Sequence, residues 1–298
     1  MDMFEWRSAR PFGIETELNP DDLVFHYTTI ERAAAIGLTG RILLGPLATL
    51  NDPQESEVRR LIASTSDMFA PDLDERTAAF QIELATLRSE IRVACFTRDA
   101  MLGASGTVER ADGRGFARSA MWAHYGDGHE GACIALDRGQ LEQLANKLSP
   151  DARCAPVSYA AGLNLDVYRA EYVDIDHPDL ATQHGAVLDS LFTKNSDWSP
   201  EREYRIVIDS WTDPVCAIEV LGAVRGLAFG NSLKPHQIPL VESLRKAFDL
   251  NYSEVALMMH QNGLLTAVPI YDSDGVPHRW TSDELSSGAV YDLAAPDS

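Results

Sequence analysis

The segment from Ser196 to Asp209 constrains the fold most, because it places two carboxylates directly before a convincing β-strand. From Glu203 onward two sets of side chains alternate, Tyr204, Ile206 and Ile208 on one face and Glu203, Arg205 and Val207 on the other. Such alternation predicts a half-buried strand with one face toward a core. Pro200 lacks a backbone N–H and ends whatever element precedes the strand.

The two carboxylates of this segment belong to Glu201 and Glu203. If the strand already begins at Glu201, both side chains share a face, and neighbouring carboxylates either raise each other's pKa or need a cation. Arg202, Arg205 and Lys194 are available as that cation. Two interpretations stay open from these residues alone: the rim of an active site, or a solvated strand end with a Glu203–Arg205 ion pair.

The net negative charge of the chain disfavours binding to nucleic acid and to anionic membranes. Its 298 residues carry 45 acidic and 25 basic side chains, a formal net charge of −20. Such a surface repels anionic membranes and nucleic acid, and no run of Lys and Arg offers a local basic patch. The first residues have no basic and apolar signal pattern, so we expect a cytoplasmic protein without a membrane partner. Four separated cysteines without a CxxC pair predict buried free thiols.

The pattern of apolar and turn residues predicts an arm over residues 1–21, one domain over 22–271 and a polar tail over 272–298. Within the domain the expected strands are 23–28, 41–44, 91–97, 132–137, 153–159, 203–208, 215–220, 224–229 and 264–271. The expected helices are 30–36, 53–64, 74–92, 117–125, 141–148, 179–192, 235–248 and 253–261. No GxGxxG or GxxxxGK[ST] spacing follows a strand, which disfavours Rossmann and P-loop nucleotide binding.

Several other side chains are candidates for chemistry. His26 lies on the first expected strand, where a histidine is usually a satisfied core residue but could donate a hydrogen bond to a sugar hydroxyl. Trp122 and Tyr125 offer flat surfaces for a ring, although rings at this spacing are more often core. His124 and His129 are separated by glycines, but no third ligand lies close and there is no HExxH motif, so we expect no metal site.

The order of the motifs is informative as a set. His-Tyr-Thr at 26–28, Asn-Asp-Pro at 51–53, Met-Trp-Ala-His-Tyr at 121–125 and Trp-Ser-Pro-Glu-Arg-Glu-Tyr-Arg at 198–205 follow one another. Over about residues 22–232 this order resembles a bacterial family of unknown function. That family in turn looks like a distant member of the ADP-ribosyltransferase superfamily, similar to DarT-type toxins at the first motif.

The resemblance implies an α+β fold with an ADP-ribosyltransferase-like split pair of small antiparallel sheets, surrounding helices, and NAD bound as substrate in the cleft between the sheets. It implies that Glu203 contacts the ribose 2′-hydroxyl and stabilises the charge of the transition state, with Glu201 competing for this catalytic role. It brings to the NAD site His26, Tyr27, Thr28, Asn51, Trp122, Tyr125 and Arg205. No metal is needed.

The implied activity is transfer of ADP-ribose from NAD to an acceptor macromolecule that the sequence does not identify, in a defence or toxin protein. A catalytically silent module that senses a nucleotide or a protein is the alternative from a different class. NAD hydrolysis and RNA 2′-phosphate transfer are further alternatives, and the net charge of −20 counts against an RNA substrate.

Overall fold

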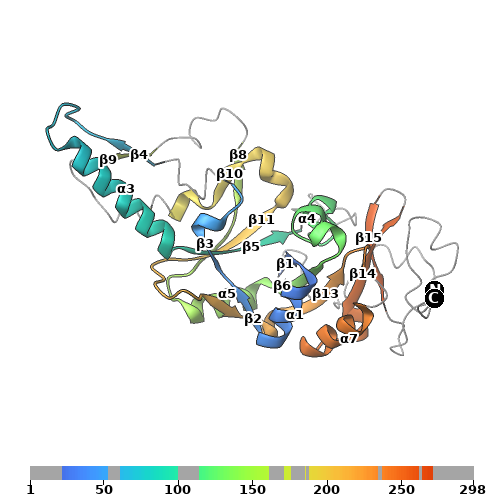
Figure 1. Cartoon of the computed structure of the whole chain (residues 1–298). Coiled ribbons are helices and arrows are strands. Elements are labelled where there is room, and N and C mark those ends of the chain that lie inside the picture. The colour runs from blue at the N-terminus through green and yellow to red at the C-terminus, as the bar shows by residue number, and fades with distance from the viewer. Residues whose placement is uncertain are drawn as a thin grey trace. The chain divides into compact units, whose positions relative to one another are not determined.

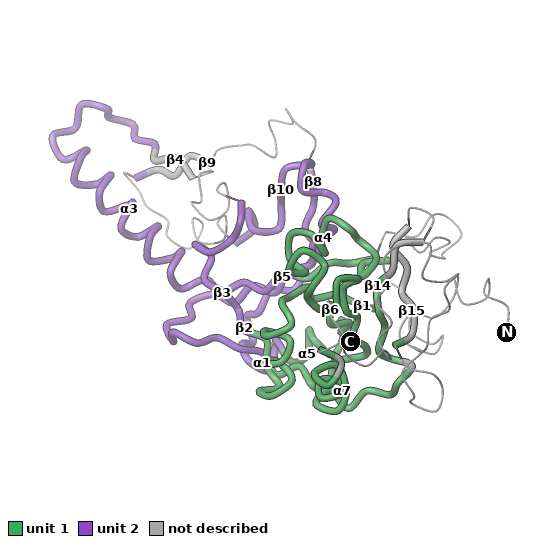
Figure 2. The backbone as a smooth tube through the Cα atoms, turned by 45° about the vertical axis from the view of Figure 1, so that its right-hand side comes forward, with its two compact units in different colours: residues 1–42, 96–144, 219–298 green, residues 43–95, 145–218 purple. Residues whose placement is uncertain are grey.

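The computed structural model describes residues 22–52, 61–99, 114–160, 171–175, 185, 188–233, 237–261 and 264–270. The chain divides into two compact units (Figure 2). Unit 1 comprises residues 1–42, 96–144 and 219–298, and unit 2 comprises residues 43–95 and 145–218. Strands and helices occur in both units, so the chain is α+β, as predicted. The expected arm and tail lie outside the described residues.

Unit 1 is built on a sheet in which neighbouring strands follow the order β15-β14-β13-β6-β1 (Figure 1). These strands are β1 Leu23–Thr28, β6 Ala132–Asp137, β13 Val224–Phe229, β14 Val255–Gln261 and β15 Leu264–Pro269. β6 runs antiparallel to β1 and β13, while β13 and β14 run parallel. Residues 132–136 of β6 are all buried, as expected for an apolar strand with neighbours on both edges.

The helices of unit 1 begin and end where local chemistry dictates. α1 (Ile30–Thr39) starts at Thr29, whose hydroxyl accepts a hydrogen bond from the Arg32 N–H, and it ends at Gly40, whose φ of +72° suits a residue without Cβ. α7 (Ile238–Ala247) lies in the crossover that joins the parallel strands β13 and β14. The other helices that begin in this unit are α4 Ser119–His124, η6 Asp127–His129, α5 Arg138–Leu148, η8 Leu221–Ala223 and η10 Tyr252–Glu254.

An aromatic core fills one face of the unit 1 sheet. Its large members are Phe25, Tyr27, Phe116, Met121, Trp122 and Met258. The rings of Tyr27 and Trp122 meet edge to face with centroids 5.1 Å apart. Such a geometry adds to the free energy gained from burying the two rings. The core therefore rests on rings from β1 and α4.

Unit 2 contains the strand that was predicted to follow the two carboxylates. β11 (Glu203–Ile208) runs antiparallel to β7 (Arg153–Pro156), and β5 (Arg92–Arg98) is its neighbour on the other side. β5 belongs to unit 2 up to Cys95 and to unit 1 from Phe96. Smaller elements are β3 Gly45–Pro46, η4 Leu47–Thr49, β4 Leu61–Ser64, β8 Ser158–Ala160, β9 Glu171–Asp174, β10 Thr193–Asn195 and η7 Ser196–Glu201. Parallel pairs join β8 to β10 and β4 to β9, and β2 (Arg41–Leu43) pairs with β12 (Ala217–Glu219).

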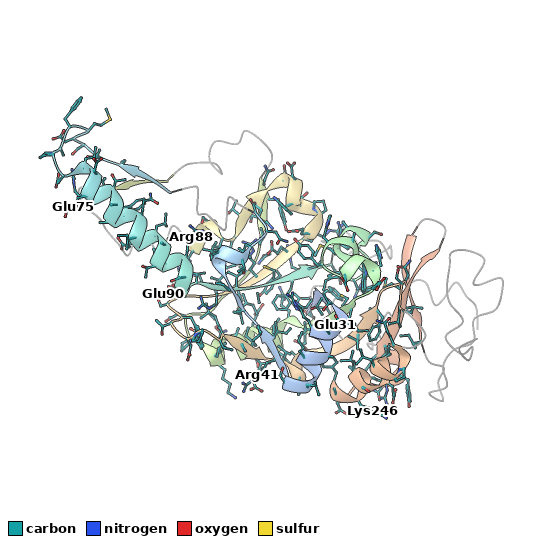
Figure 3. The ribbon with its side chains drawn as sticks, viewed as in Figure 1. Glu31, Arg41, Glu75, Arg88, Glu90 and Lys246 are labelled. Atoms are coloured by element: carbon teal, nitrogen blue, oxygen red, sulfur yellow. The ribbon has the colours of Figure 1, made fainter. Side chains whose placement is uncertain are left out.

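The apolar core of unit 2 lies between α3 (Leu73–Glu90) and the strands. Its buried members are Leu47, Phe80, Leu84, Ile91, Val93, Ile175, Leu188, Leu191 and Val207. Charged side chains such as Glu75, Arg88 and Glu90 are distributed along α3 (Figure 3). The helix therefore buries a narrow stripe, of which Phe80 and Leu84 are the buried residues.

Two helices expected from the sequence are wrong. Residues 255–261 form strand β14, not a helix, because the run Val255-Ala-Leu-Met258 is buried throughout beside β13, and a short apolar run does not distinguish a buried strand from a buried helix. Residues 61–64 form strand β4, whereas residues 53–60 of that expected helix lie outside the described residues. Most of the expected helix over 179–192 also lies outside them.

Two expected strands and the expected type of sheet also need correction. The six residues of β11 are all buried, so the strand is not half-buried; side chains of its own unit cover its charged face. The strand expected over 153–159 is two strands, β7 and β8, separated at Val157, whose N–H donates to the Glu203 carbonyl at 2.9 Å. Because of the parallel pairs, the sheets are mixed and not purely antiparallel.

Candidate functional site

A buried lysine in unit 2 joins the two carboxylates that the sequence singled out. Lys194 lies on β10, and its Nζ donates to Glu201 Oε2 at 2.8 Å and to Glu203 Oε2 at 3.1 Å. Lys194 is 4% exposed and Glu203 is also 4% exposed. A charge this far from water needs a partner of opposite sign, so the three side chains are mutually dependent.

Arg205 completes the cluster from the same strand as Glu203. Residues two apart on a strand share a face, which sets the guanidinium beside the carboxylate. Arg205 Nε donates to Glu203 Oε1 at 2.6 Å and Nη2 donates to Oε2 at 2.8 Å, a bidentate pair. Arg205 is fully buried, and its Nη1 donates to the Leu191 carbonyl. The formal charges of the four side chains, Lys194, Glu201, Glu203 and Arg205, sum to zero.

The surroundings of Glu203 fix its protonation state. Burial alone would raise the pKa of Glu203, but the Arg205 guanidinium and the Lys194 ammonium outweigh burial and hold that pKa below its ordinary value of 4.5. Glu203 is therefore ionised at neutral pH inside a largely dry site. A fixed negative charge in such a place can stabilise a positive charge that develops nearby.

The backbone between the two glutamates explains why their side chains converge. β11 begins at Glu203, not at Glu201, so the two glutamates do not share a strand face. The expectation that Pro200 ends the preceding element is also wrong, because the 3₁₀ helix η7 contains Pro200 and continues to Glu201. Between them Arg202 adopts the left-handed conformation with φ +47° and ψ +49°. This conformation is unfavourable for a residue with a Cβ and turns the chain sharply. It brings Glu201 and Glu203 to the same ammonium.

Two further side chains touch the cluster. The Tyr159 hydroxyl accepts a hydrogen bond from the Glu203 backbone N–H at 2.7 Å, and burial, reinforced by the nearby carboxylates, raises the pKa of Tyr159 to about 12. The Cys95 thiol hydrogen-bonds the Glu203 side chain, and burial followed by the charge of Glu203 raises the pKa of Cys95 well above its ordinary value. Cys95 therefore stays a protonated thiol, which is a poor nucleophile.

Trp198, in η7, lies against Lys194. The Lys194 Nζ is 4.7 Å from the centroid of the Trp198 ring, within the range of a cation–π contact. The ring is partly exposed, unlike the charges beside it. In the sequence Trp198 stands in the Trp-Ser-Pro-Glu motif and Tyr159 at the end of an expected strand, and neither was predicted to have a role. The sequence feature that could have indicated Trp198 is its position three residues before Glu201, one of the two paired carboxylates.

The residues expected to contact the sugar and the leaving ring lie in unit 1. His26 is half-buried on β1, with its ring centroid 5.6 Å from that of Phe96. Tyr27 and Trp122 are core residues: the Tyr27 hydroxyl donates to the Gly115 carbonyl at 2.7 Å, and Trp122 Nε1 donates to the Phe116 carbonyl at 2.8 Å.

Of the three expected rings, Tyr27 and Trp122 are buried and Tyr125 is partly exposed. Thr28 is buried at the end of β1, and Asn51 is exposed in unit 2. Their roles toward NAD stay predictions, as does a cleft shared by His26 and Glu203. Tyr125 is the expected ring with surface to offer a ligand.

A tight backbone crossing adjoins these residues in unit 1. The Gly230 N–H donates to the Gly131 carbonyl at 3.0 Å, and the Ser232 N–H donates to the His129 carbonyl at 3.1 Å. A Cβ on Gly230 would overlap the His129 carbonyl, and one on Gly131 would overlap the Thr28 carbonyl. The two glycines therefore hold the turn before β6 against the end of β13.

The described residues limit two other kinds of site. Among them, no group of three or more His, Cys, Asp or Glu side chains is arranged to hold a metal ion. In the same part of the chain, no helix combines the length and the apolar character needed to cross a bilayer. All four cysteines are free thiols, as predicted, but only Cys133 and Cys216 are buried, whereas Cys95 and Cys154 keep some exposed surface.

Comparison with known proteins gives one match. Residues 121–206 are similar to a family described as a protein of unknown function (DUF2971). This region runs from α4 to β11 and contains Lys194, Glu201, Glu203 and Arg205. No curated protein and no solved structure matches the chain. The expected similarity to a family of unknown function is thus supported over this region.

Proposed function

We propose that this chain is an enzyme that cleaves NAD and transfers ADP-ribose to an acceptor, with Glu203 as the catalytic carboxylate. The observation that carries the proposal is a carboxylate kept ionised at 4% exposure by Arg205 and Lys194. The ADP-ribosyltransferase-like motif order belongs to this proposal, as does an ADP-ribosyltransferase-like fold whose sheets are mixed and not purely antiparallel.

The reaction needs a fixed negative charge more than it needs a nucleophile. When the bond between C1′ of the ribose and nicotinamide breaks, its electron pair leaves with nicotinamide and positive charge develops on the ribose. A preorganised carboxylate stabilises that charge without reorganising, whereas water would have to reorient. The acceptor nucleophile then bonds to C1′ and releases its proton.

The cluster suits this task because its cations fix the carboxylate in place. Arg205 holds both oxygens of Glu203 and Lys194 holds one of them, so Glu203 can neither rotate freely nor take up a proton at neutral pH. Glu201, on the other side of Lys194, supplies a second negative group. We assign Glu203 the principal role and Glu201 a supporting one.

The same contacts favour a second candidate function. A carboxylate that already accepts three hydrogen bonds from Arg205 and Lys194 is also what a purely structural ion network contains. In that case the chain is a catalytically silent module that senses a nucleotide or a protein. NAD hydrolysis differs from the transferase only in that water replaces the acceptor.

The test is NAD turnover by the purified chain, measured as nicotinamide released, with and without protein or nucleic-acid acceptors. We expect Glu203→Gln to lower turnover by roughly 10²–10³ and to change NAD affinity far less. Glu201→Gln should be the milder change. Glu219→Gln is the matched control, because Glu219 is also an ion-paired strand glutamate but is exposed beside Arg41.

The outcomes separate the candidates. A folded Glu203→Gln variant with parental turnover removes the catalytic role of Glu203. Release of nicotinamide at the same rate without any acceptor, with free ADP-ribose as product, indicates a hydrolase. A folded parent chain that consumes no NAD with any acceptor favours the sensing module.

A further inference from the structure

Trp198 differs from the other tryptophans of the described part of the chain in two respects. Trp122 Nε1 donates to the Phe116 carbonyl and Trp211 Nε1 donates to the Val215 carbonyl, whereas the Trp198 indole N–H has no hydrogen-bond partner there. In addition, Trp198 is partly exposed directly beside the buried charges of the cluster. A partly exposed ring with an uncommitted donor is well suited to hold a ligand ring.

The local structure holds this ring in place. Asn195 caps the start of η7, because its side chain accepts a hydrogen bond from the Asp197 N–H, and η7 contains Pro200, which restricts the backbone. The Lys194 ammonium lies 4.7 Å from the ring centroid and is itself fixed by two carboxylates. A platform that is already ordered loses little conformational entropy when a ligand stacks on it.

We propose that Trp198 is a stacking platform for a neutral planar base, and, resting on the function proposed above, that this base is the adenine of NAD. The Lys194 ammonium determines which kind of ligand ring can stack on Trp198. The electron-rich face of an indole attracts cations, and Lys194 already makes this contact with the Trp198 ring. A cationic nicotinamide ring gains less at such a platform than an uncharged base does. The free indole N–H can donate to a ligand acceptor.

Adenosine is the probe, because it has the base but neither a phosphate nor a bond to nicotinamide. We expect it to bind the full chain in calorimetric titration, and Trp198→Leu to weaken binding by roughly tenfold or more, as when a ring that stacks on a base is removed. Trp198→Phe, which keeps a ring, should retain most of the affinity. Trp211→Phe is the matched control and should bind like the parent.

Two further measurements sharpen the test. 1-Methylnicotinamide, whose ring is a pyridinium cation, should bind more weakly than adenosine, and its affinity should not depend on Trp198. If the parent turns over NAD, Trp198→Leu should raise KM while kcat changes little, because a remote binding contact is lost. Circular dichroism of each variant confirms that it folds.

The proposal is overturned if the parent does not bind adenosine, or if a folded Trp198→Leu variant binds it like the parent. Its failure is distinct from that of the proposed function. Adenosine binding that depends on Trp198 in a chain that never consumes NAD supports the platform and removes the transferase. NAD turnover with a KM unaffected by Trp198→Leu removes the platform alone.

Discussion

The centres of the two units are stabilised by opposite kinds of chemistry. In unit 1, buried rings from β1 and α4 pack together, and two glycine backbones cross beside them. In unit 2, two cations and two carboxylates are buried together on β10, η7 and β11. Both centres are buried, but apolar side chains fill the centre of unit 1, whereas ion pairs satisfy the buried charges in the centre of unit 2.

The comparison indicates where each unit tolerates change. Apolar packing loses stability in proportion to the atoms removed and to the cavity that they leave. A buried ion network loses most when a single member is removed, because the remaining charges are no longer balanced and water does not replace the lost partner. Unit 2 should therefore be the more sensitive to the loss of one polar side chain, and unit 1 to the addition of one methyl group.

The largest effect should come from Arg205→Met, which keeps an unbranched apolar side chain in place of the arginine stem but leaves Glu203 without its bidentate partner. We expect the free energy of unfolding to fall by about 3–5 kcal/mol in urea denaturation. Arg41→Met is the control, since Arg41 pairs with Glu219 at 2.7 Å on the surface and should contribute less than about 1 kcal/mol.

The double variant Arg205→Met with Glu203→Leu sharpens this result. Removing the carboxylate as well leaves no unpaired charge on β11, so part of the lost stability should return. Equal losses for Arg205→Met and Arg41→Met would show that the buried and the exposed ion pairs do not differ.

Gly230→Ala should give the next largest effect, in unit 1. Its Cβ would overlap the His129 carbonyl, a backbone atom that cannot move aside like a flexible side chain. We expect a loss of about 2–3 kcal/mol, typical of overpacking in a dense region, measured by urea denaturation. The control is Gly139→Ala in α5, where the nearest atom to the new Cβ is Asp137 Oδ1 at 3.6 Å. That variant should be neutral or slightly more stable, and equal losses at both glycines would contradict the crossing.

Low pH should destabilise the charged centre of unit 2 more than the apolar centre of unit 1, with a smaller effect than the substitutions above. Because the pKa of Glu203 is lower in the folded chain than its ordinary value of 4.5, Glu203 contributes stability above about pH 4.5, and this contribution is lost as the pH falls through the folded pKa. One such group changes the free energy of unfolding by at most about 1.4 kcal/mol per pH unit.

Amide hydrogen exchange can locate this loss. Below about pH 4.5 we expect exchange within β11, corrected for the intrinsic pH dependence, to accelerate relative to β6, and Glu203→Gln to remove that difference. If amide exchange accelerates equally in β6 and β11, the loss of stability at low pH is not specific to Glu203 and its surroundings, and the prediction fails.

Much of the fold followed from sequence pattern where pattern and environment agree. β1, β6 and β13 have the bounds expected from their apolar runs. β14 was missed because a short run that is buried on all sides has no period to read.

The candidate site was predictable in composition but not in geometry. The pair Glu203 and Arg205 and the nearby Lys194 were visible in the sequence. The left-handed backbone at Arg202 was not, because arginine has no preference for it, and the surrounding contacts impose it. Nor does a sequence say which rings are core, as with Trp122, and which keep exposed surface, as with Trp198.

The close spacing of the cluster along the chain has a consequence for how fast the protein folds. Lys194 meets Glu201 and Glu203 across seven and nine positions, so the loops that these contacts close are short and cost little entropy. Contacts that are local in sequence tend to form early. We therefore expect β10, η7 and β11 to belong to the folding nucleus, so that Lys194→Met slows refolding in a stopped-flow experiment more than it speeds unfolding. The charged side chains that cover β11 in the folded chain would then also determine how fast β11 is buried during folding.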